Sequence, residues 1–193
     1  MNNIVLASSS PRRIELLKKF NIDPIIIKPN IVEKVSIEDS VEEISMALAF
    51  EKANQVSNNF NNGEIIMAFD TLVAYDGEIL GKPKSEDDAI NMLKLLSNKE
   101  HVVVTGLSII KANTNIKVID YEKTYVKFRQ LDDKIIKNYI NTQEYKDKAG
   151  AYGIQGIGGV LIEWINGCYF NVVGLPLYRL DILLDKHFDI RLL

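Results

Sequence analysis

Three serines and two arginines follow the first apolar segment of the chain, and their types suit phosphate binding. Residues 3–7 are mostly apolar and run into Ser8-Ser9-Ser10-Pro11-Arg12-Arg13, where a helix is predicted to begin. A helix N-terminus presents free N–H groups and partial positive charge, and hydroxyls and guanidiniums add donors that fit phosphate oxygens. We expect Ser10 to cap this helix and Pro11 to be its first residue. The pattern indicates a polyphosphate site, with a well-capped surface helix as the alternative.

A second candidate group is acidic. Asp70 follows the apolar, β-forming residues 64–69, and Glu33 stands in an upstream loop that has few other polar residues. Metal-dependent attack of water on phosphorus needs hard oxygen ligands for the ion and a base for the water. Carboxylates at strand ends supply both, so we predict that Asp70 ends its strand and does this work. An aspartate that merely starts a turn is the alternative.

Two lysines are placed so that they could clamp an anion. Lys52 falls on an otherwise apolar ladder of a predicted helix, and Lys82 is held between Gly81 and Pro83 in a restricted loop. A lysine on an apolar ladder can also extend its ammonium group into solvent, and Lys82 could simply be solvated. Each lysine alone is therefore a weak indication of a site.

The segment 150–159 contains five of the 11 glycines of the chain. Glycine lets the backbone approach a ligand closely, so the segment could form a pocket for a nucleotide base. Within it, the Gln155 side chain could both donate to and accept from a base edge, and Tyr152 could offer a face for stacking. The segment lacks the sequences of a P-loop and of a dinucleotide-binding fingerprint. A conformationally demanding turn is the alternative.

Composition excludes several classes of protein. The 193 residues are 47% hydrophobic and 25% charged, which suits one ordinary domain or two modest lobes with a real core. The formal net charge of −3 argues against general nucleic-acid binding. One cysteine, Cys168, and two histidines cannot build an ordinary Cys/His zinc site, so oxygen ligands would hold any metal. Because neither a secretory signal nor a membrane span is predicted, we expect a cytoplasmic protein with no membrane partner.

The elements that must position these residues alternate between strands and helices. We predict strands over residues 3–7, 64–69, 72–75, 78–80, 101–110 and 116–128, and helices that start near Pro11, Ser40, Ser85, Asp132 and Leu177. Asp76-Gly77 is the turn of one hairpin, and Asn166-Gly167 joins residues 160–165 to 169–173 in a second. Hairpins require antiparallel pairs, so we predict an α/β fold with a mixed central sheet flanked by helices.

Together, these segments resemble the Maf family of nucleoside triphosphate pyrophosphatases over essentially the whole chain. The resemblance rests on ordered motifs, which are Leu6-Ala7-Ser8-Ser9-Ser10-Pro11-Arg12-Arg13, Glu33, Lys52, Asp70-Thr71, Gly81-Lys82-Pro83, His101 with Thr105-Gly106, residues 147–156 and Val173-Gly174-Leu175-Pro176. It implies a single domain over residues 1–193, with an elongated mixed sheet in two lobes similar to that of the inosine triphosphate pyrophosphatases (the Maf/Ham fold). The resemblance also implies an active-site cleft between the lobes. One departure is Phe69, which replaces a small residue before Asp70.

The resemblance further implies an activity: hydrolysis of a nucleoside triphosphate between its α and β phosphates, with a divalent cation, Mg²⁺ or Mn²⁺. Asp70 would accept the proton of the attacking water, and Glu33 would help Asp70 to hold the metal. The residues implied around the triphosphate are Ser8, Arg12, Arg13, Lys52 and Lys82, and Lys82 would also take part in catalysis.

Substrate preference and partners are implied in the same way. Arg12, Thr71 and Gln155 match the positions that mark the subgroup preferring dTTP and UTP. Relatives of this kind are often homodimers, so a homodimer is expected, and a small-molecule nucleoside triphosphate is the expected partner rather than nucleic acid. The family's association with inhibited division gives one alternative, a nucleotide-binding regulator of septum formation or cell division.

Overall fold

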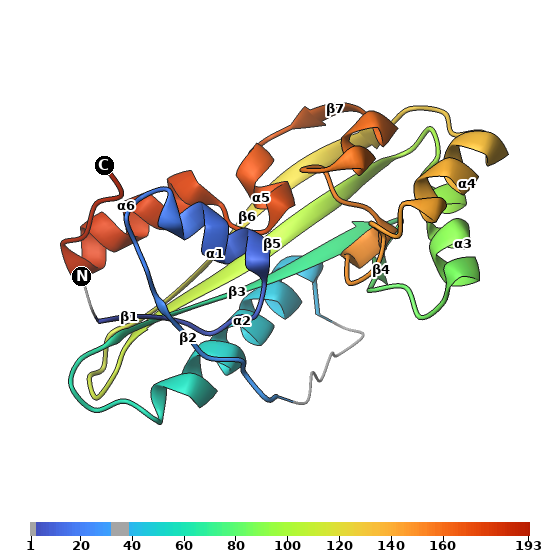
Figure 1. Ribbon diagram of the computed structural model, residues 1–193. Helices are drawn as coiled ribbons and strands as arrows, with labels where there is room; N and C mark the ends of the chain where they lie inside the picture. The colour runs from blue at the N-terminus through green and yellow to red at the C-terminus, as the bar shows by residue number, and fades with distance from the viewer. Residues whose placement is uncertain (1–2, 32–38) are drawn as a thin grey trace. The chain divides into compact units, whose positions relative to one another are not determined.

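The computed structural model describes residues 3–31 and 39–193. Its elements, in chain order, are β1 (Ile4–Leu6), α1 (Pro11–Lys18), β2 (Ile25–Ile26), α2 (Val41–Ser57), β3 (Ile65–Tyr75), β4 (Glu78–Leu80), α3 (Glu86–Leu96), β5 (Glu100–Lys111), β6 (Lys117–Phe128), α4 (Asp133–Asn141), two 3₁₀ segments (Ala149–Ala151 and Ile157–Leu161), β7 (Ile162–Asn166), α5 (Tyr169–Val173) and α6 (Leu177–Phe188) (Figure 1). Strands and helices alternate along most of the chain, as predicted.

The strands form one mixed sheet. Their order is β2-β1-β3-β5-β6-β7, and β4 pairs with β3 outside this path. β1 is parallel to both β2 and β3, whereas the β3/β4 and β6/β7 pairs are antiparallel. The prediction of an α/β fold with a mixed central sheet flanked by helices is therefore confirmed. None of the helices in the described residues has the length and apolar character that crossing a membrane would require.

The chain divides into two compact units. Unit 1 comprises Met1–Asp70, Thr105–Glu122 and Gly174–Leu193, and unit 2 comprises Thr71–Val104 and Lys123–Val173. Three strands, β3, β5 and β6, therefore contribute residues to both units. Most of the predicted phosphate-binding residues belong to unit 1, whereas Lys82, Thr71 and Gln155 belong to unit 2.

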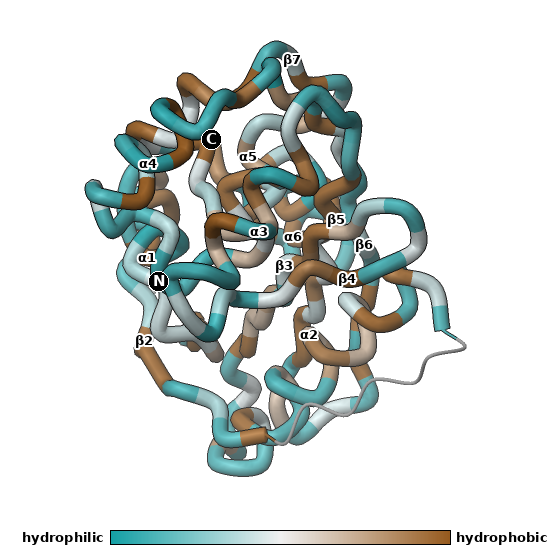
Figure 2. Tube along the Cα trace, turned by 90° about the vertical axis from the view of Figure 1, so that its right-hand side faces the viewer, coloured by the Kyte–Doolittle hydropathy of each residue, from teal (hydrophilic) through white to brown (hydrophobic). Residues whose placement is uncertain are grey.

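The core of unit 1 packs α2 against β1, β3 and β5. Its buried residues are small and β-branched, and they are Val5, Ala7, Ala53, Val56, Ile66, Ala68, Ile110 and Ala112. α2 begins near Ser40, as predicted, with a capping box: Ser40 accepts the Glu43 N–H, and the Glu43 carboxylate accepts the Ser40 N–H. At the sheet edge, β2 is coloured as hydrophobic in Figure 2, and its two isoleucines are exposed.

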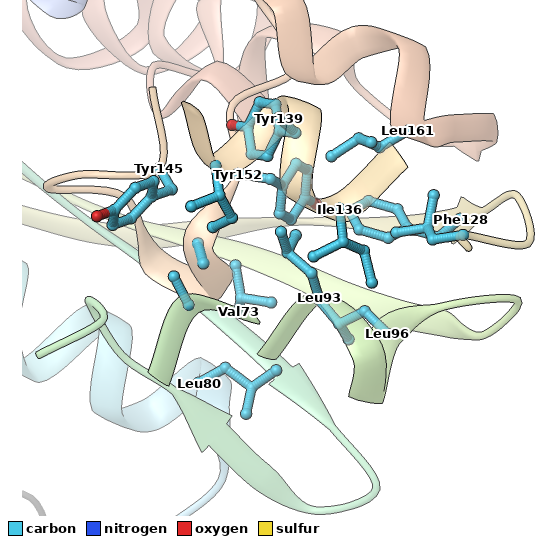
Figure 3. Close-up of a cluster of buried hydrophobic side chains, with 14 of the residues drawn as sticks. Val73, Leu80, Leu93, Leu96, Phe128, Ile136, Tyr139, Tyr145, Tyr152 and Leu161 are labelled. Carbon is cyan, nitrogen blue, oxygen red and sulfur yellow. The ribbon is translucent and has the colours of Figure 1, made fainter. Parts of the chain in front are cut away.

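The core of unit 2 is larger and more aromatic. Side chains from β3, β4, α3, β6 and α4 meet in a single buried cluster, part of which Figure 3 shows. α3 and α4 begin where the sequence predicts, because Ser85 accepts the Asp88 N–H and Asp132 accepts the Ile135 N–H. Tyr152 lies inside this cluster, with its ring 4.7 Å from that of Phe128. The proposed stacking role of Tyr152 is therefore wrong, because the ring is already part of the core.

The prediction of a second hairpin, between residues 160–165 and 169–173, is also wrong. β7 pairs with β6, and residues 169–173 form the helix α5 instead of a returning strand. The cause is the buried Asn171, whose amide donates to the carbonyl of Val103 at 3.0 Å and to Thr124 Oγ1 at 2.9 Å. The same Thr124 hydroxyl also bonds both the N–H and the carbonyl of Cys168. These contacts hold a helical turn, although the residues themselves favour a strand.

Candidate active site

Asp70 lies in the middle of β3, which runs unbroken from Ile65 to Tyr75, so the prediction that it ends a strand is wrong. Its side chain is buried, and its Oδ1 is bonded to the Nζ of Lys52 in an ion pair. A strand can continue through a buried carboxylate when a cation compensates the charge. The other oxygen, Oδ2, is buried and has no hydrogen-bond partner among the described residues. It is therefore a fixed acceptor for a proton or for a cation.

Lys52 reaches Asp70 from α2. Ile44, Leu48, Lys52 and Val56 are spaced four residues apart and so lie on one side of the helix, and the three apolar members are buried. The core contacts of this ladder fix the position of the lysine, whose side chain is only 15% exposed. Lys52 is thus directed into unit 1 and not into solvent.

A close contact between backbones sets the distance of α2 from the sheet. A Cβ atom on Gly106 of β5 would lie 2.2 Å from the carbonyl carbon and oxygen of Ser45 in α2. Only glycine fits there. The Thr105-Gly106 motif noted in the sequence therefore has a structural meaning: it allows the helix that carries Lys52 to pack directly on the strand.

Ser8 and Arg13 are tied together at the start of α1. Ser8 Oγ accepts the Ser10 N–H and an N–H of the Arg13 Nη1, each at 3.2 Å, while Arg13 Nε donates to the Gly174 carbonyl at 2.7 Å. Both acceptor positions of the Ser8 hydroxyl are thereby used, so its own hydrogen is available to donate. Ser10 occupies the N-cap position, but within the described residues its side chain accepts no N–H from the helix, contrary to prediction.

The Arg13 guanidinium lies over Phe69, 5.7 Å from the centre of the ring. Phe69 itself is fully buried, so this family departure supplies a floor for the arginine. Burial lowers the pKa of Arg13 to about 10, while the negative charge of Asp70 acts in the opposite direction. The side chain remains a cation at neutral pH. Arg13 thus places a positive charge close to Asp70 in a largely desolvated setting.

Arg12 contrasts with its neighbour. It is half-buried and makes no hydrogen bond or ion pair with any residue in the ranges 3–31 and 39–193. Since Arg13 is bonded to Ser8 and Gly174, Arg12 is the arginine of this pair whose donors, as far as the described residues go, can bind an external anion. Among the predicted residues of unit 1, the structure therefore brings together Ser8, Arg13, Lys52 and Asp70.

The remaining predicted residues are not part of that group. Glu33 lies outside the described residues. In unit 2, Lys82 follows β4 and is exposed, Thr71 is half-buried in β3, and Gln155 is exposed in the glycine-rich segment. The roles assigned to these residues stay predictions.

A divalent cation can be tested against these side chains. In residues 3–31 and 39–193, no group of three or more His, Cys, Asp or Glu side chains could hold a metal ion. The buried, unpartnered Oδ2 of Asp70 is nevertheless the hard oxygen donor that Mg²⁺ or Mn²⁺ prefers. Asp70 therefore fits as one ligand of such a cation.

His101 is a residue of the core, and Glu144 contacts the glycine-rich segment. His101 is buried, its Nε2 lies 2.7 Å from the Tyr152 hydroxyl, and burial lowers its pKa to about 4. It is therefore a neutral core residue. Glu144 accepts backbone N–H groups of the glycine-rich segment. This role was not predicted, because a glutamate after a helix carries no local signal of it.

Comparisons with known proteins show which family the chain belongs to. The family model described as Maf-like protein matches residues 3–187. A dTTP/UTP pyrophosphatase of Alkaliphilus oremlandii is 47% identical over 193 residues, covering 100% of both chains. A dTTP/UTP pyrophosphatase of Caldicellulosiruptor bescii is 50% identical over 189 residues, covering 96% of this chain and 95% of that one.

Among solved structures, the Ham1 protein of Staphylococcus aureus matches with a TM-score of 0.43 and 18% sequence identity, covering 65% of this chain and 71% of that chain. The sequence matches are more extensive, since the family model takes in nearly every residue and the two relatives align over nearly their full length. The chain belongs to the Maf family.

Proposed function

We propose that this protein hydrolyses dTTP and UTP to the nucleoside monophosphate and pyrophosphate. The observation that carries the proposal is the buried Asp70, held at Oδ1 by Lys52 and left with an unpartnered Oδ2 among the described residues. The names of the full-length relatives, dTTP/UTP pyrophosphatases, support the choice of substrate. No observation favours the alternative of a division regulator.

In this proposal, Asp70 acts as the general base. Its Oδ2 accepts a proton from water as the water oxygen forms a bond to phosphorus. The bond from that phosphorus to the oxygen bridging the α and β phosphates breaks, and its electron pair stays on the bridging oxygen, so that the nucleoside monophosphate and pyrophosphate separate. Lys52 orients the Asp70 carboxylate, because its ammonium group is bonded to Oδ1.

Cationic groups would bind the triphosphate. Arg12 supplies donors to phosphate oxygens, and the Ser8 hydroxyl donates its hydrogen. Arg13 contributes its charge from a position fixed by Ser8, Gly174 and Phe69. Lys82 would bind the phosphates from its restricted loop, as the resemblance predicts.

A divalent cation would be held by Asp70 and by Glu33. When bound, it supplies positive charge that polarises the phosphate oxygens and offsets charge that develops during the reaction.

Base selection would rest on Arg12, Thr71 and Gln155. Uracil and thymine present carbonyl acceptors beside an N3–H donor, and one carboxamide such as Gln155 can satisfy an acceptor and a donor together. A cytoplasmic location and a homodimer also remain part of the proposal.

The proposal is tested by incubating the protein with a panel of ribo- and deoxyribonucleoside triphosphates and either Mg²⁺ or Mn²⁺. Pyrophosphate and the nucleoside monophosphate are measured as separate products. We expect equal amounts of the two, with dTTP and UTP the best substrates. Release of orthophosphate and a nucleoside diphosphate would contradict the proposed bond, and a purine as the best substrate would contradict the proposed specificity.

A further inference from the structure

The carboxylate of Glu144 holds one end of the glycine-rich segment of unit 2. Its Oε2 accepts the N–H of Ile157 at 2.8 Å, and its Oε1 accepts the N–H of Gly158 at 3.0 Å. A charged acceptor makes a stronger hydrogen bond to backbone N–H than a neutral one. Two adjacent N–H groups on one carboxylate therefore fix both the position and the direction of this part of the backbone.

Close contacts explain two glycines of the segment, one against Glu144 and one against the backbone. A Cβ atom on Gly156 would lie 2.3 Å from the Oε2 atom of Glu144, and one on Gly158 would lie 2.6 Å from the carbonyl oxygen of Gly153. The backbone thus wraps closely around the glutamate side chain. Local flexibility is not what these two glycines provide, because the contacts leave no space for a side chain.

Tyr139 and Lys148 complete the support. The Tyr139 hydroxyl accepts the Gly153 N–H at 3.3 Å and donates to Glu144 Oε1 at 3.4 Å. Burial raises the pKa of Tyr139, so the phenol stays protonated and can act as that donor. The Lys148 ammonium bonds to the Glu144 carbonyl. The segment is therefore anchored at Gly153 on one side and at Ile157 and Gly158 on the other.

Gln155 lies between these two anchors and is exposed. We propose that Glu144 is a positioning residue that holds the backbone on both sides of Gln155, so that its carboxamide can read the pyrimidine base. This inference rests on the proposed function, because it assumes that the protein selects dTTP and UTP through Gln155. Glu144 does not touch the substrate; it acts through the segment 153–158.

The test compares Glu144→Ala, Glu144→Gln and Gln155→Ala with the parent protein. Glu163→Ala is the matched control, because it removes an exposed carboxylate from β7 in the same unit. We measure kcat and KM for UTP and for GTP, and the hydrogen exchange of the Ile157 and Gly158 amides. A double variant, Glu144→Ala with Gln155→Ala, tests whether the two residues act together.

We expect Glu144→Ala to raise KM for UTP and to lower the UTP-over-GTP ratio of kcat/KM about tenfold or more, because small displacements of a positioned group are costly. Its kcat should change little, since Asp70 and Lys52 are untouched. The two amides should exchange faster. Glu144→Gln should recover part of the ratio, because the amide oxygen still accepts a hydrogen bond, and the double variant should be no less selective than Gln155→Ala alone.

Several results would overturn the inference. One is a folded Glu144→Ala protein whose substrate ratio equals that of Glu163→Ala, and another is a loss of kcat with an unchanged KM. If Glu144→Ala does not fold, Glu144→Gln with the full ratio and parental amide exchange overturns it equally. A parent protein that lacks preference for UTP would instead overturn the proposed function, and amide exchange would then still report whether Glu144 anchors the segment.

Discussion

Replacing Gly106 by alanine probes how α2 positions the lysine that pairs with Asp70. The new Cβ atom would lie 2.2 Å from the carbonyl carbon and oxygen of Ser45, against an ordinary contact distance of 3.4–4 Å. The contact is between two backbone segments, so no flexible side chain can move aside. Helix and strand must separate by more than 1 Å to reach that ordinary distance.

The expected effects are on both stability and activity. Overpacking of this kind costs about 1–3 kcal/mol in the free energy of unfolding. Lys52 lies seven residues after Ser45 on the same helix, about 10 Å along its axis at the usual rise per residue. A shift of α2 therefore displaces the ammonium group from Asp70. Because a misplacement of about 1 Å can cost about 100-fold in rate, we expect kcat/KM for dTTP to fall between about tenfold and 100-fold.

Urea unfolding and pyrophosphate release measure the two effects. Gly81→Ala is the stability control, because a Cβ atom there would meet nothing within 4 Å. That variant should lose no more than about 0.5 kcal/mol. The reasoning is refuted if Gly106→Ala is as stable as Gly81→Ala. A destabilised Gly106→Ala protein with undiminished kcat/KM would refute the link to Lys52 alone.

Two further predictions concern the buried polar groups of unit 2. Asn171→Ala should lower the free energy of unfolding by about 2–3 kcal/mol, because the carbonyl of Val103 and the hydroxyl of Thr124 lose a buried donor. Urea unfolding measures this change. A loss under about 0.5 kcal/mol would show that α5 is held by other contacts. Burial lowers the pKa of His101 to about 4, below its usual value of 6.5, so below pH 6.5 the unfolded chain binds the proton more readily than the folded one. The free energy of unfolding should therefore fall by up to about 3 kcal/mol as pH drops from about 6.5 to 4. His101→Gln should remove this part of the pH dependence. An unchanged pH dependence in that variant would contradict the assignment of this effect to His101.

Local signals predicted the elements whose ends are set by neighbouring residues. The Ser40–Glu43 capping box lies at the start of α2, and Asp76-Gly77 forms a turn in which both residues have positive φ, 52° and 80°. Asp and Gly are the residues that accept such a conformation. Each of these signals lies within four residues of the feature that it predicts, so the sequence alone sufficed.

The errors arose where distant residues decide the structure. Residues 169–173 have strand-forming side chains, yet the buried amide of Asn171 bonds to Val103 and Thr124, which are 68 and 47 residues away. Asp70 was expected at a strand end because it follows the apolar, β-forming residues 64–69. The strand continues through it because its charge is compensated by Lys52, which is 18 residues away. The anchor of the glycine-rich segment, Glu144, was missed for the same reason, since its partners are 13 and 14 residues away.

The central claim is that Asp70 is the base of a pyrophosphatase, and one comparison tests it most directly. Asp70→Asn keeps the shape of the side chain and an oxygen for Lys52 but removes the proton acceptor. Asp76→Asn is the matched control, because it makes the same change in the exposed turn of the same hairpin. Turnover of dTTP and calorimetric binding of dTTP are measured for both variants with the divalent cation present.

We predict that Asp70→Asn lowers kcat by about 100-fold to 10,000-fold, as expected for loss of a general base, while dTTP still binds. Asp76→Asn should match the parent protein in both measurements. If Asp70→Asn turns over dTTP at a rate within about tenfold of the parent rate, the central claim is contradicted, because hydrolysis must then use a proton acceptor other than Asp70.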